Sequence, residues 1–249
     1  MDPLKICIAL FSYGGIEGMT FDSLQNELLW AKDQKLSVLF SRVHGDALIS
    51  RSRSKALSSF LEKTDANVFF MLDHDVEWTT GQIVATCAKA HERQAIVGGF
   101  YSCRGFGMGM SGRLKSEQVT VKIGADALHD AEYIGGGFTA IPRQVAEEVL
   151  KAGKRAAREG QTDFAATETD LALHECLYTD GSKFYDFFRP IVVPSTMEEG
   201  AFEYLSEDWS WSHRARQANP NRPQYLWSQP VLRHWGTYGY MMNTSMKER

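Results

Sequence analysis

The sequence VFFMLDHDVEW, residues 68–78, runs five apolar residues directly into Asp73, His74 and Asp75. An apolar run of this length is typical of a buried β-strand. Side chains at positions i and i+2 of a strand point to the same face, so we expect Asp73 and Asp75 to lie together and His74 to point away. A simpler interpretation is that one of the two carboxylates caps a helix that begins near Thr79.

Strands and helices are expected to alternate on both sides of this stretch, as far as residue 102. Apolar, β-prone runs predict strands, and apolar residues at helical spacing predict helices. The expected strands are 4–14, 35–45, 66–78 and 94–102, and the expected helices are 20–34, 46–64 and 79–93. This alternation predicts parallel βαβ units. From residue 103 on, the sequence is glycine-rich and irregular, with further helices expected at 143–160 and 206–219.

The composition is that of a globular protein with a mildly acidic charge balance. The chain has 249 residues and a formal net charge of −4, so no overall positive field attracts it to nucleic acid or to an anionic membrane. We expect no transmembrane helix, because no run of about 18 apolar residues occurs, and no signal peptide, because the first apolar run is short. The four cysteines form no Cys-x-x-Cys pair and are expected to be reduced thiols of a cytoplasmic protein.

The place of Asp73 and Asp75 at the end of an expected strand has a chemical consequence. In an open parallel sheet, ligands bind beyond the carboxyl ends of the strands. Two carboxylates at such an end repel each other unless a cation lies near them. Hard divalent cations prefer oxygen ligands and keep open positions for substrate phosphates. The pair therefore predicts a divalent-cation site beside a phosphate-bearing ligand.

The stretch FFMLDHDVEW resembles the Asp-x-Asp strand end of glycosyltransferases with the GT-A fold, which bind a nucleotide-sugar through a divalent metal. Four other stretches resemble segments of that family and occur in the family's order. They are ISRSRSKAL (49–57), YIGGGFTAIPRQV (133–145), LSEDWSWSHRARQ (205–217) and LRHWGTYGY (232–240). The similarity is one of order and spacing, and it extends over about residues 5–236.

This resemblance implies an α/β fold of the GT-A type in a single domain, residues 1–249. The expected parts are a Rossmann-like nucleotide-binding half at 1–102 with a mixed central sheet, and a loop-rich acceptor half at 103–249. Chains of this kind resemble small bacterial and bacteriophage glycosyltransferases, including those related to family 2 and to the Anp1-type mannosyltransferases. The implied activity is metal-dependent transfer of a sugar from a nucleotide-sugar, with a UDP-sugar as the expected donor, to an acceptor hydroxyl.

The resemblance also implies a metal site for Mn²⁺ or Mg²⁺. Asp75 is the expected direct ligand, and Asp73 is expected to contact the ribose, or the metal through water. His234 is the expected third ligand, and its imidazole suits Mn²⁺ better than Mg²⁺. The alternative for His234 is a packed side chain between Arg233 and Trp235.

Five further residues are expected to contact the nucleotide-sugar. Arg53 is the basic residue of its helix that we expect to meet the phosphates or the base. Ser12 and Tyr13, at the end of the first expected strand, are placed to meet uracil and ribose. Gly136 and Gly137 let the backbone approach a ligand closely, although a close packing contact inside the protein would also require glycine.

The candidate catalytic residues are Glu207 and Asp208, at the start of an expected helix. By resemblance, Asp208 is the favoured base that deprotonates the acceptor hydroxyl in an inverting displacement, whereas retaining relatives use a similar pair to bind the acceptor. The alternative is that both carboxylates only satisfy the preference of a helix start for negative charge.

The sequence leaves the acceptor open among a glycan, a protein and a hydroxymethylated base in phage DNA, in the host cytoplasm if the chain is phage-encoded. For DNA, the expected contact surface consists of Arg104, Arg113, Arg143, Lys154, Arg155 and Arg158. The aromatic candidates for stacking on a sugar or a base are Trp209, Trp211, Trp227, Trp235 and Tyr238. Two other functions compete: a nucleotidyltransferase, which would need a basic residue in the loop after the first strand, and a non-catalytic sugar-binding module.

Overall fold

The computed structural model describes residues 2–103, 109–116, 119–162, 170–195, 198–236, 239–241 and 246–247. Five helices lie in these ranges: α1 (Gly18–Asp33), α2 (Ile49–Lys63), α3 (Gln82–Arg93), α4 (Arg143–Thr162) and α5 (Glu207–Ala218). No helix among the described residues is long and apolar enough to cross a membrane.

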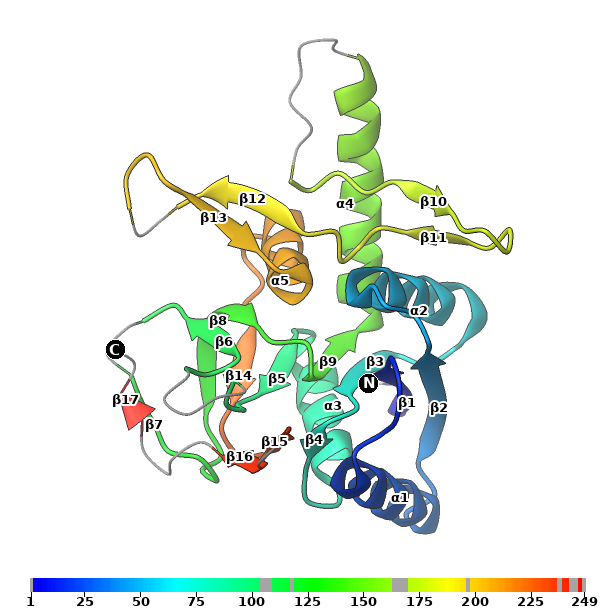
Figure 1. Ribbon diagram of the computed structural model, residues 1–249, viewed down its shortest axis with the longest axis vertical. Helices are drawn as coiled ribbons and strands as arrows, with labels where there is room; N and C mark the ends of the chain where they lie inside the picture. Colours follow the sequence, from blue (N-terminus) through cyan, green and yellow to red (C-terminus); the bar gives the residue numbers. More distant parts are fainter. Residues whose placement is uncertain are drawn as a thin grey trace.

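One eight-stranded mixed sheet forms the centre of the molecule (Figure 1). In spatial order its strands are β2 (Ser37–His44), β1 (Lys5–Ser12), β3 (Val68–Asp73), β9 (Phe138–Pro142), β5 (Val97–Gly99), β14 (Tyr225–Trp227), β8 (Leu128–Ile134) and β6 (Gly112–Leu114). Strands β1, β2 and β3 are parallel, as the strand–helix alternation predicts, and β5 is parallel to β14. Strand β9 is antiparallel to both of its neighbours, so the expectation of a mixed central sheet is confirmed.

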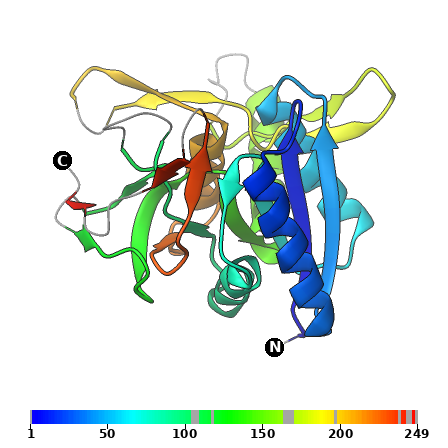
Figure 2. The same cartoon turned by 60° about the horizontal axis from the view of Figure 1, so that its bottom comes forward.

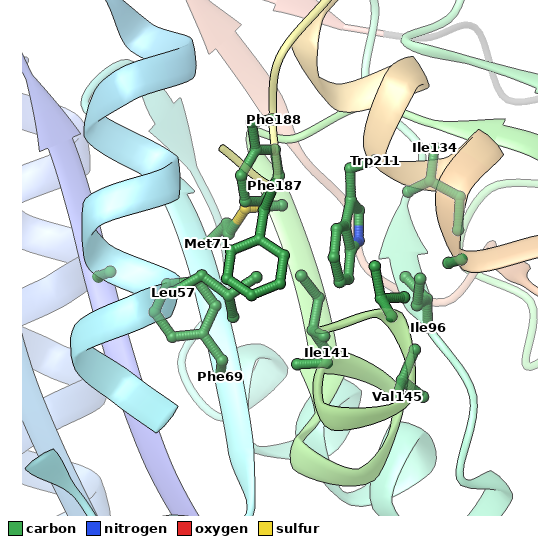
Figure 3. Packing of buried hydrophobic residues seen from close by; sticks show 14 of the residues in the cluster. Leu57, Phe69, Met71, Ile96, Ile134, Ile141, Val145, Phe187, Phe188 and Trp211 are labelled. Carbon is green, nitrogen blue, oxygen red and sulfur yellow. The ribbon is translucent and has the colours of Figure 1, made fainter. Parts of the chain in front are cut away.

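Strands β1 and β3 are buried on both faces of the sheet: their alternate side chains point to opposite sides, and each set packs in a core of its own. Phe69 and Met71 belong to a core with residues of α2, α4 and α5, including Trp211. Phe70 and Leu72 belong to a second core with residues of α1 and α3. Figure 3 shows the first core, in which Leu57, Phe187 and Trp211 gather around the strand residues. This double burial explains why the sequence of β3 is a continuous apolar run.

Strand β9 carries the glycine segment of the sequence to the centre of the sheet. It pairs antiparallel with β3 on one side and with β5 on the other. The segment Gly135–Gly137 precedes β9, so it lies beside the end of β3, where the backbone N–H of Asp73 donates to the carbonyl oxygen of Gly137 at 3.0 Å. The antiparallel insertion thus places the glycine segment next to the carboxylates of β3.

Four small sheets complete the described structure. Two are hairpins, β10 (Glu175–Leu177) with β11 (Lys183–Tyr185), and β12 (Ile191–Pro194) with β13 (Phe202–Leu205). The others are β4 (Val76–Glu77) with β15 (Arg233–Trp235) and β16 (Gly239–Met241), and β7 (Thr120–Val121) with β17 (Met246–Lys247). Both hairpins lie beyond the end of the sheet toward which β2 points (Figure 2). This is the end at which β1 and β3 also terminate, because the three strands are parallel.

A buried carboxylate, Glu27 of α1, fixes the chain that follows β4. It accepts hydrogen bonds from the indole Nε1 of Trp78 at 3.2 Å, from the N–H of Gly81 at 2.6 Å and from the N–H of Val84 at 3.1 Å. Burial raises the pKa of Glu27, and these donors oppose part of that rise. Gly81 has a φ of +87°, in the left-handed region that favours glycine. Glu27 therefore holds together the start of α3 and the turn that leads to it.

We predict that Glu27→Ala lowers the free energy of unfolding by about 3 kcal/mol, since three buried donors each lose a bond of about 1 kcal/mol. Urea denaturation followed by circular dichroism measures the change. Gln25→Ala, on the exposed side of the same helix, is the matched control and is expected to change stability little. An equal effect of the two substitutions would show that the three donors do not depend on Glu27.

Candidate functional site

A cleft of about 340 Å³ lies beyond the carboxyl ends of β1 and β3. Its lining includes five of the residues that the sequence singled out, and these come from three distant segments. They are Ser12, Tyr13, Asp73, Asp75 and His234. The end of β2, the start of α2 and the loop between them supply most of the remaining wall, through Val43, Asp46, Ala47, Ile49 and Ser52.

The chain turns at His74 and Asp75, where the sequence led us to expect a continuing strand. Strand β3 ends at Asp73, and β4 begins only at Val76. The alternation of faces therefore stops at Asp73, and His74 lines the cleft together with both carboxylates. The expectation that His74 points away is wrong for this reason.

Strand β15 brings His234 to Asp75. It pairs antiparallel with β4, with His234 opposite Val76, and the N–H of Trp235 donates to the carbonyl oxygen of Asp75 at 2.7 Å. The imidazole Nε2 of His234 lies 3.4 Å from Oδ2 of Asp75, whose side chain is almost completely buried. Two residues that are far apart in the sequence thus form one pair of candidate ligands.

The contact made by the other ring nitrogen of His234 indicates which of the two nitrogens carries the hydrogen. Nδ1 lies 2.9 Å from the carbonyl oxygen of Ser102, and because a carbonyl only accepts, we assign the hydrogen to Nδ1. In the neutral ring, Nε2 then directs a lone pair at the Asp75 carboxylate. An imidazole oriented by a backbone carbonyl beside a carboxylate is a donor set that suits Mn²⁺.

Asp73 is directed to a different partner. Its Oδ1 accepts a hydrogen bond from the guanidinium of Arg53 at 2.7 Å. Among the residues that the structure describes, no three or more His, Cys, Asp or Glu side chains form a group that could hold a metal ion. Asp75 and His234 therefore form a two-residue set, and Asp73 belongs to a neighbouring ion-pair network.

Arg53 is the centre of that network. It is 2% exposed, and its second guanidinium nitrogen donates to Oε1 of Glu207 at 2.8 Å. Burial alone would lower the pKa of Arg53, but the charges of Asp73, Glu207 and Asp208 outweigh it and raise the pKa. Arg53 therefore stays charged and joins the end of β3 to the start of α5.

The glycine segment passes this network at very close range. A Cβ added to Gly136 would lie 2.1 Å from a guanidinium nitrogen of Arg53, and one added to Gly137 would lie 2.8 Å from the hydroxyl oxygen of Tyr101. The N–H of Gly137 donates to that same hydroxyl at 2.8 Å. The glycines are thus required by close contacts within the protein, which is the alternative that the sequence left open beside direct ligand contact.

The two carboxylates at the start of α5 have different surroundings. Oδ2 of Asp208 accepts from the N–H of Gly136 at 3.0 Å, and Oδ1 accepts from the N–H of Trp209 at 2.8 Å and from the hydroxyl of Ser206. Burial raises the pKa of Glu207; Arg53 opposes this rise and the charge of Asp208 adds to it. Three hydrogen-bond donors hold the Asp208 carboxylate in one orientation, whereas the Glu207 carboxylate forms an ion pair with Arg53.

Two residues that contribute to the site were not singled out from the sequence. The hydroxyl of Tyr101 supports the glycine segment, and burial followed by the charges of Asp73 and Asp208 raises its pKa. Arg42 of β2 donates to the hydroxyl of Ser12 at 3.1 Å and to the carbonyl oxygen of Gly14 at 2.8 Å. Arg42 could have been found from the parallel pairing of β1 with β2, which places it near the end of β1.

Most of the tryptophans expected to stack on a ligand are structural. Trp211 and Trp227 are buried, Trp209 stacks on the ring of Tyr133 with centroids 4.8 Å apart, and the indole of Trp235 donates to Glu77 at 2.8 Å. Tyr238 lies outside the described residues.

Part of the basic surface expected for DNA is also structural. Arg113 pairs with Glu132 at 2.8 Å and with Glu203 at 2.9 Å. The guanidinium of Arg143 donates to backbone carbonyls at the end of α2 and just beyond it. Arg104 lies outside the described residues. This leaves Lys154, Arg155 and Arg158 of α4, beside a groove between α4 and the end of α5.

Comparison with known proteins identifies the architecture. No protein-family model matches the chain, and no curated protein matches it significantly. The crystal structure of A197 from STIV matches with a TM-score of 0.51 and 15% identity, over 96% of this chain and 95% of that chain. The crystal structure of GalNAc-T7 with UDP, GalNAc and Mn²⁺ matches with a TM-score of 0.51 and 9% identity, over 97% of this chain and 44% of that chain. At these identities the likeness concerns the fold, and the chain has the α/β GT-A fold that its Asp-x-Asp strand end led us to expect.

Proposed function

We propose that the protein is a metal-dependent glycosyltransferase that moves a sugar from a nucleotide-sugar to an acceptor hydroxyl. The observation that carries this proposal is that Ser12, Tyr13, Asp73, Asp75 and His234 line one cleft. The cleft lies at the carboxyl ends of parallel strands, which is where open α/β sheets bind nucleotides. The pairing of β15 with β4 is needed to bring His234 there.

Within this cleft, Ser12 and Tyr13 are the proposed contacts for the nucleoside. Tyr13 is exposed at the end of β1, and the Arg42 guanidinium holds Ser12 and the backbone of Gly14 in place from the neighbouring strand. An aromatic ring and a hydroxyl fit a base and a ribose respectively. We propose UDP as the nucleotide to test first, since the GalNAc-T7 structure with the same fold contains UDP and Mn²⁺.

Asp75 and His234 are the proposed protein ligands of the cation, and diphosphate oxygens and water would complete its coordination. A divalent cation bound there would neutralise negative charge on the leaving nucleoside diphosphate. The chain's own contribution is to orient the two ligands, through the Ser102 carbonyl on His234 and the Trp235 N–H on the backbone of Asp75. Arg53 donates to Oδ1 of Asp73. The other carboxylate oxygen of Asp73 is proposed to contact the ribose, or the cation through a water molecule.

Asp208 is the proposed base. In the transfer step the acceptor oxygen gives its proton to the Asp208 carboxylate and forms a bond to the anomeric carbon, while the bond from that carbon to the diphosphate oxygen breaks. The three donors to Asp208 leave one of its four lone-pair positions for this proton. Glu207 holds the charged Arg53 in place and is proposed as a positioning residue, because its removal would leave a buried guanidinium with one carboxylate fewer.

The donor site predicts a metal-dependent thermal shift. UDP at about 100 times its Kd adds about 2.7 kcal/mol of stability, which corresponds to a rise in Tm of about 5–10 °C for a chain of this size. We expect this rise with Mn²⁺ and a much smaller one without it, and we expect Asp75→Asn to remove the dependence on Mn²⁺. Asp22→Asn, on the exposed side of α1, is the matched control. If UDP-, GDP-, dTDP- and CDP-sugars all fail to stabilise the wild type with Mn²⁺, the proposed function is wrong.

The base assignment predicts that Asp208→Asn separates binding from transfer. We expect the UDP-induced rise in Tm to persist, and the release of UDP in the presence of acceptors to fall by about 10²–10⁴-fold. Glu207→Gln is the comparison: it is expected to lower the Tm of the unliganded protein as well, since Arg53 loses a charged partner. Undiminished transfer by Asp208→Asn would assign the base to another group.

The close approach at Gly136 predicts that Gly136→Ala destabilises the protein. The new methyl group would displace the Arg53 guanidinium from Asp73 and Glu207, and the disruption of a buried ion pair costs about 3–5 kcal/mol. Urea denaturation measures this loss. Gly18→Ala, where an added Cβ meets no atom within 4 Å, is the control and is expected to be neutral or slightly stabilising. A stable, active Gly136→Ala variant would mean that the segment moves freely away from Arg53.

A further inference from the structure

The hairpin β12–β13 has an apolar face that is exposed in the described part of the chain. In its register Val192 lies opposite Tyr204 and Pro194 lies opposite Phe202, so these four side chains share one face. Val192 is 57% exposed, Phe202 71% and Tyr204 70%. Two large aromatic side chains this exposed on one short strand are unusual, since aromatic side chains normally bury most of their area. We call these four residues the hairpin platform.

The opposite face of the hairpin fixes the platform to the body of the protein. Ile191, Val193 and Leu205 are buried and pack with Tyr133 and Trp209. The N–H of Ile191 donates to the hydroxyl of Ser210 in α5 at 3.2 Å. The hairpin is also tied at Glu203, which accepts from Arg113 at 2.9 Å and from the hydroxyl of Ser195 at 3.1 Å. The platform is therefore a surface of fixed orientation.

The platform lies close to the candidate catalytic residues along the chain. Strand β13 ends at Leu205 and α5 begins at Glu207, so Tyr204 and Asp208 are separated by only three residues. A strand rises about 3.3 Å per residue, which places the backbone of Tyr204 within about 13 Å of that of Asp208. The hairpin also lies beyond the same end of the sheet as the cleft (Figure 2). A chain-like acceptor whose terminal hydroxyl reaches Asp208 can therefore extend along the platform.

The charge and size of the platform select the class of occupant. The charged residues of the hairpin are the acidic Glu198, Glu199 and Glu203, which disfavour a nucleic acid, because nucleic-acid binding requires cations to neutralise phosphates. The four platform side chains offer on the order of 400 Å², whereas a stable interface between two protein copies buries about 800 Å² on each side. An uncharged glycan has no phosphates that need cations, and a few sugar rings can be bound by a surface of this area. The C–H faces of sugar rings also stack on the negative faces of aromatic rings.

From these observations we propose that the hairpin platform is an acceptor subsite for a neutral oligosaccharide, with Phe202 and Tyr204 stacking on successive parts of the glycan. This inference rests on the proposed glycosyltransferase function and commits it to one of the acceptor classes that the sequence left open. The platform residues do not line the nucleotide cleft, so the two proposals make separate predictions.

The test is binding of neutral hexasaccharides in the absence of nucleotide. Isothermal titration calorimetry is carried out with maltohexaose, cellohexaose, chitohexaose and a mannohexaose. We expect one of them to bind the wild type, and the double variant Phe202→Ala/Tyr204→Ala to bind it at least about tenfold more weakly, since both stacking rings are removed. Tyr204→Phe keeps the ring and is expected to retain most of the affinity.

Two controls separate this proposal from folding and from the proposed function. Phe40→Ala, at an exposed phenylalanine of β2, is expected to leave hexasaccharide binding unchanged. The rise in Tm with UDP and Mn²⁺ is expected to be the same in the double variant as in the wild type, which shows an intact fold and donor site. Failure of the wild type to show that rise counts against the proposed function, whereas the hexasaccharide titration does not depend on it.

Three outcomes would overturn the proposal. The first is that none of the four hexasaccharides binds the wild type, or that the double variant binds as tightly as the wild type. The second is that the double variant loses binding of a double-stranded DNA oligonucleotide, which would assign the platform to nucleic acid. The third is that analytical ultracentrifugation finds a wild-type dimer that the double variant converts to a monomer, which would assign the platform to a second copy of the chain.

Discussion

The site depends on one buried guanidinium, that of Arg53, held between the carboxylates of Asp73 and Glu207. A buried charge must be matched by charges and hydrogen bonds, and this requirement constrains every neighbour. It brings the start of α5 to the end of β3, and it excludes any side chain at Gly136. The two ion pairs of Arg53 therefore link helix α2 to strand β3 and to helix α5, and the glycine segment packs against the same guanidinium.

Because Arg53 occupies one oxygen of Asp73, the two carboxylates of the Asp-x-Asp sequence have different surroundings. Asp73 faces the ion-pair network, and Asp75 faces His234 across a turn. The carboxylates at the start of α5 differ in the same way: Glu207 is bound to the guanidinium, and Asp208 is bound by neutral donors. In each pair, one member is ion-paired with Arg53 and the other is not.

The sequence predicted the features that depend on local pattern, and missed those that depend on long-range contacts. Continuous apolar runs predicted the strands β1 and β3 because both faces of these strands are buried. The partners of Arg53 could not be predicted from the sequence. Helical spacing indicates the face of the helix on which Arg53 lies, but Glu207 is far away in the sequence and is brought close only by the fold. The orientation of His74 was missed because the strand period was extended into a turn. The tryptophans were expected at a ligand surface, yet the exposed aromatic residues of the hairpin platform come from a short strand of unremarkable sequence.

The pairing of β14 with β5 and β8 also governs how the chain reaches this structure. Strand β14, at Tyr225–Trp227, fills the position between two strands made much earlier, and without it the sheet is divided into two parts. A newly made chain can form β1, β2, β3 and β9, but the sheet cannot close until Trp227 has left the ribosome. Such long-range closure is slow, and the strand edges of β5 and β8 stay unprotected in the meantime. During synthesis, these two strand edges can therefore pair with other chains until β14 is added.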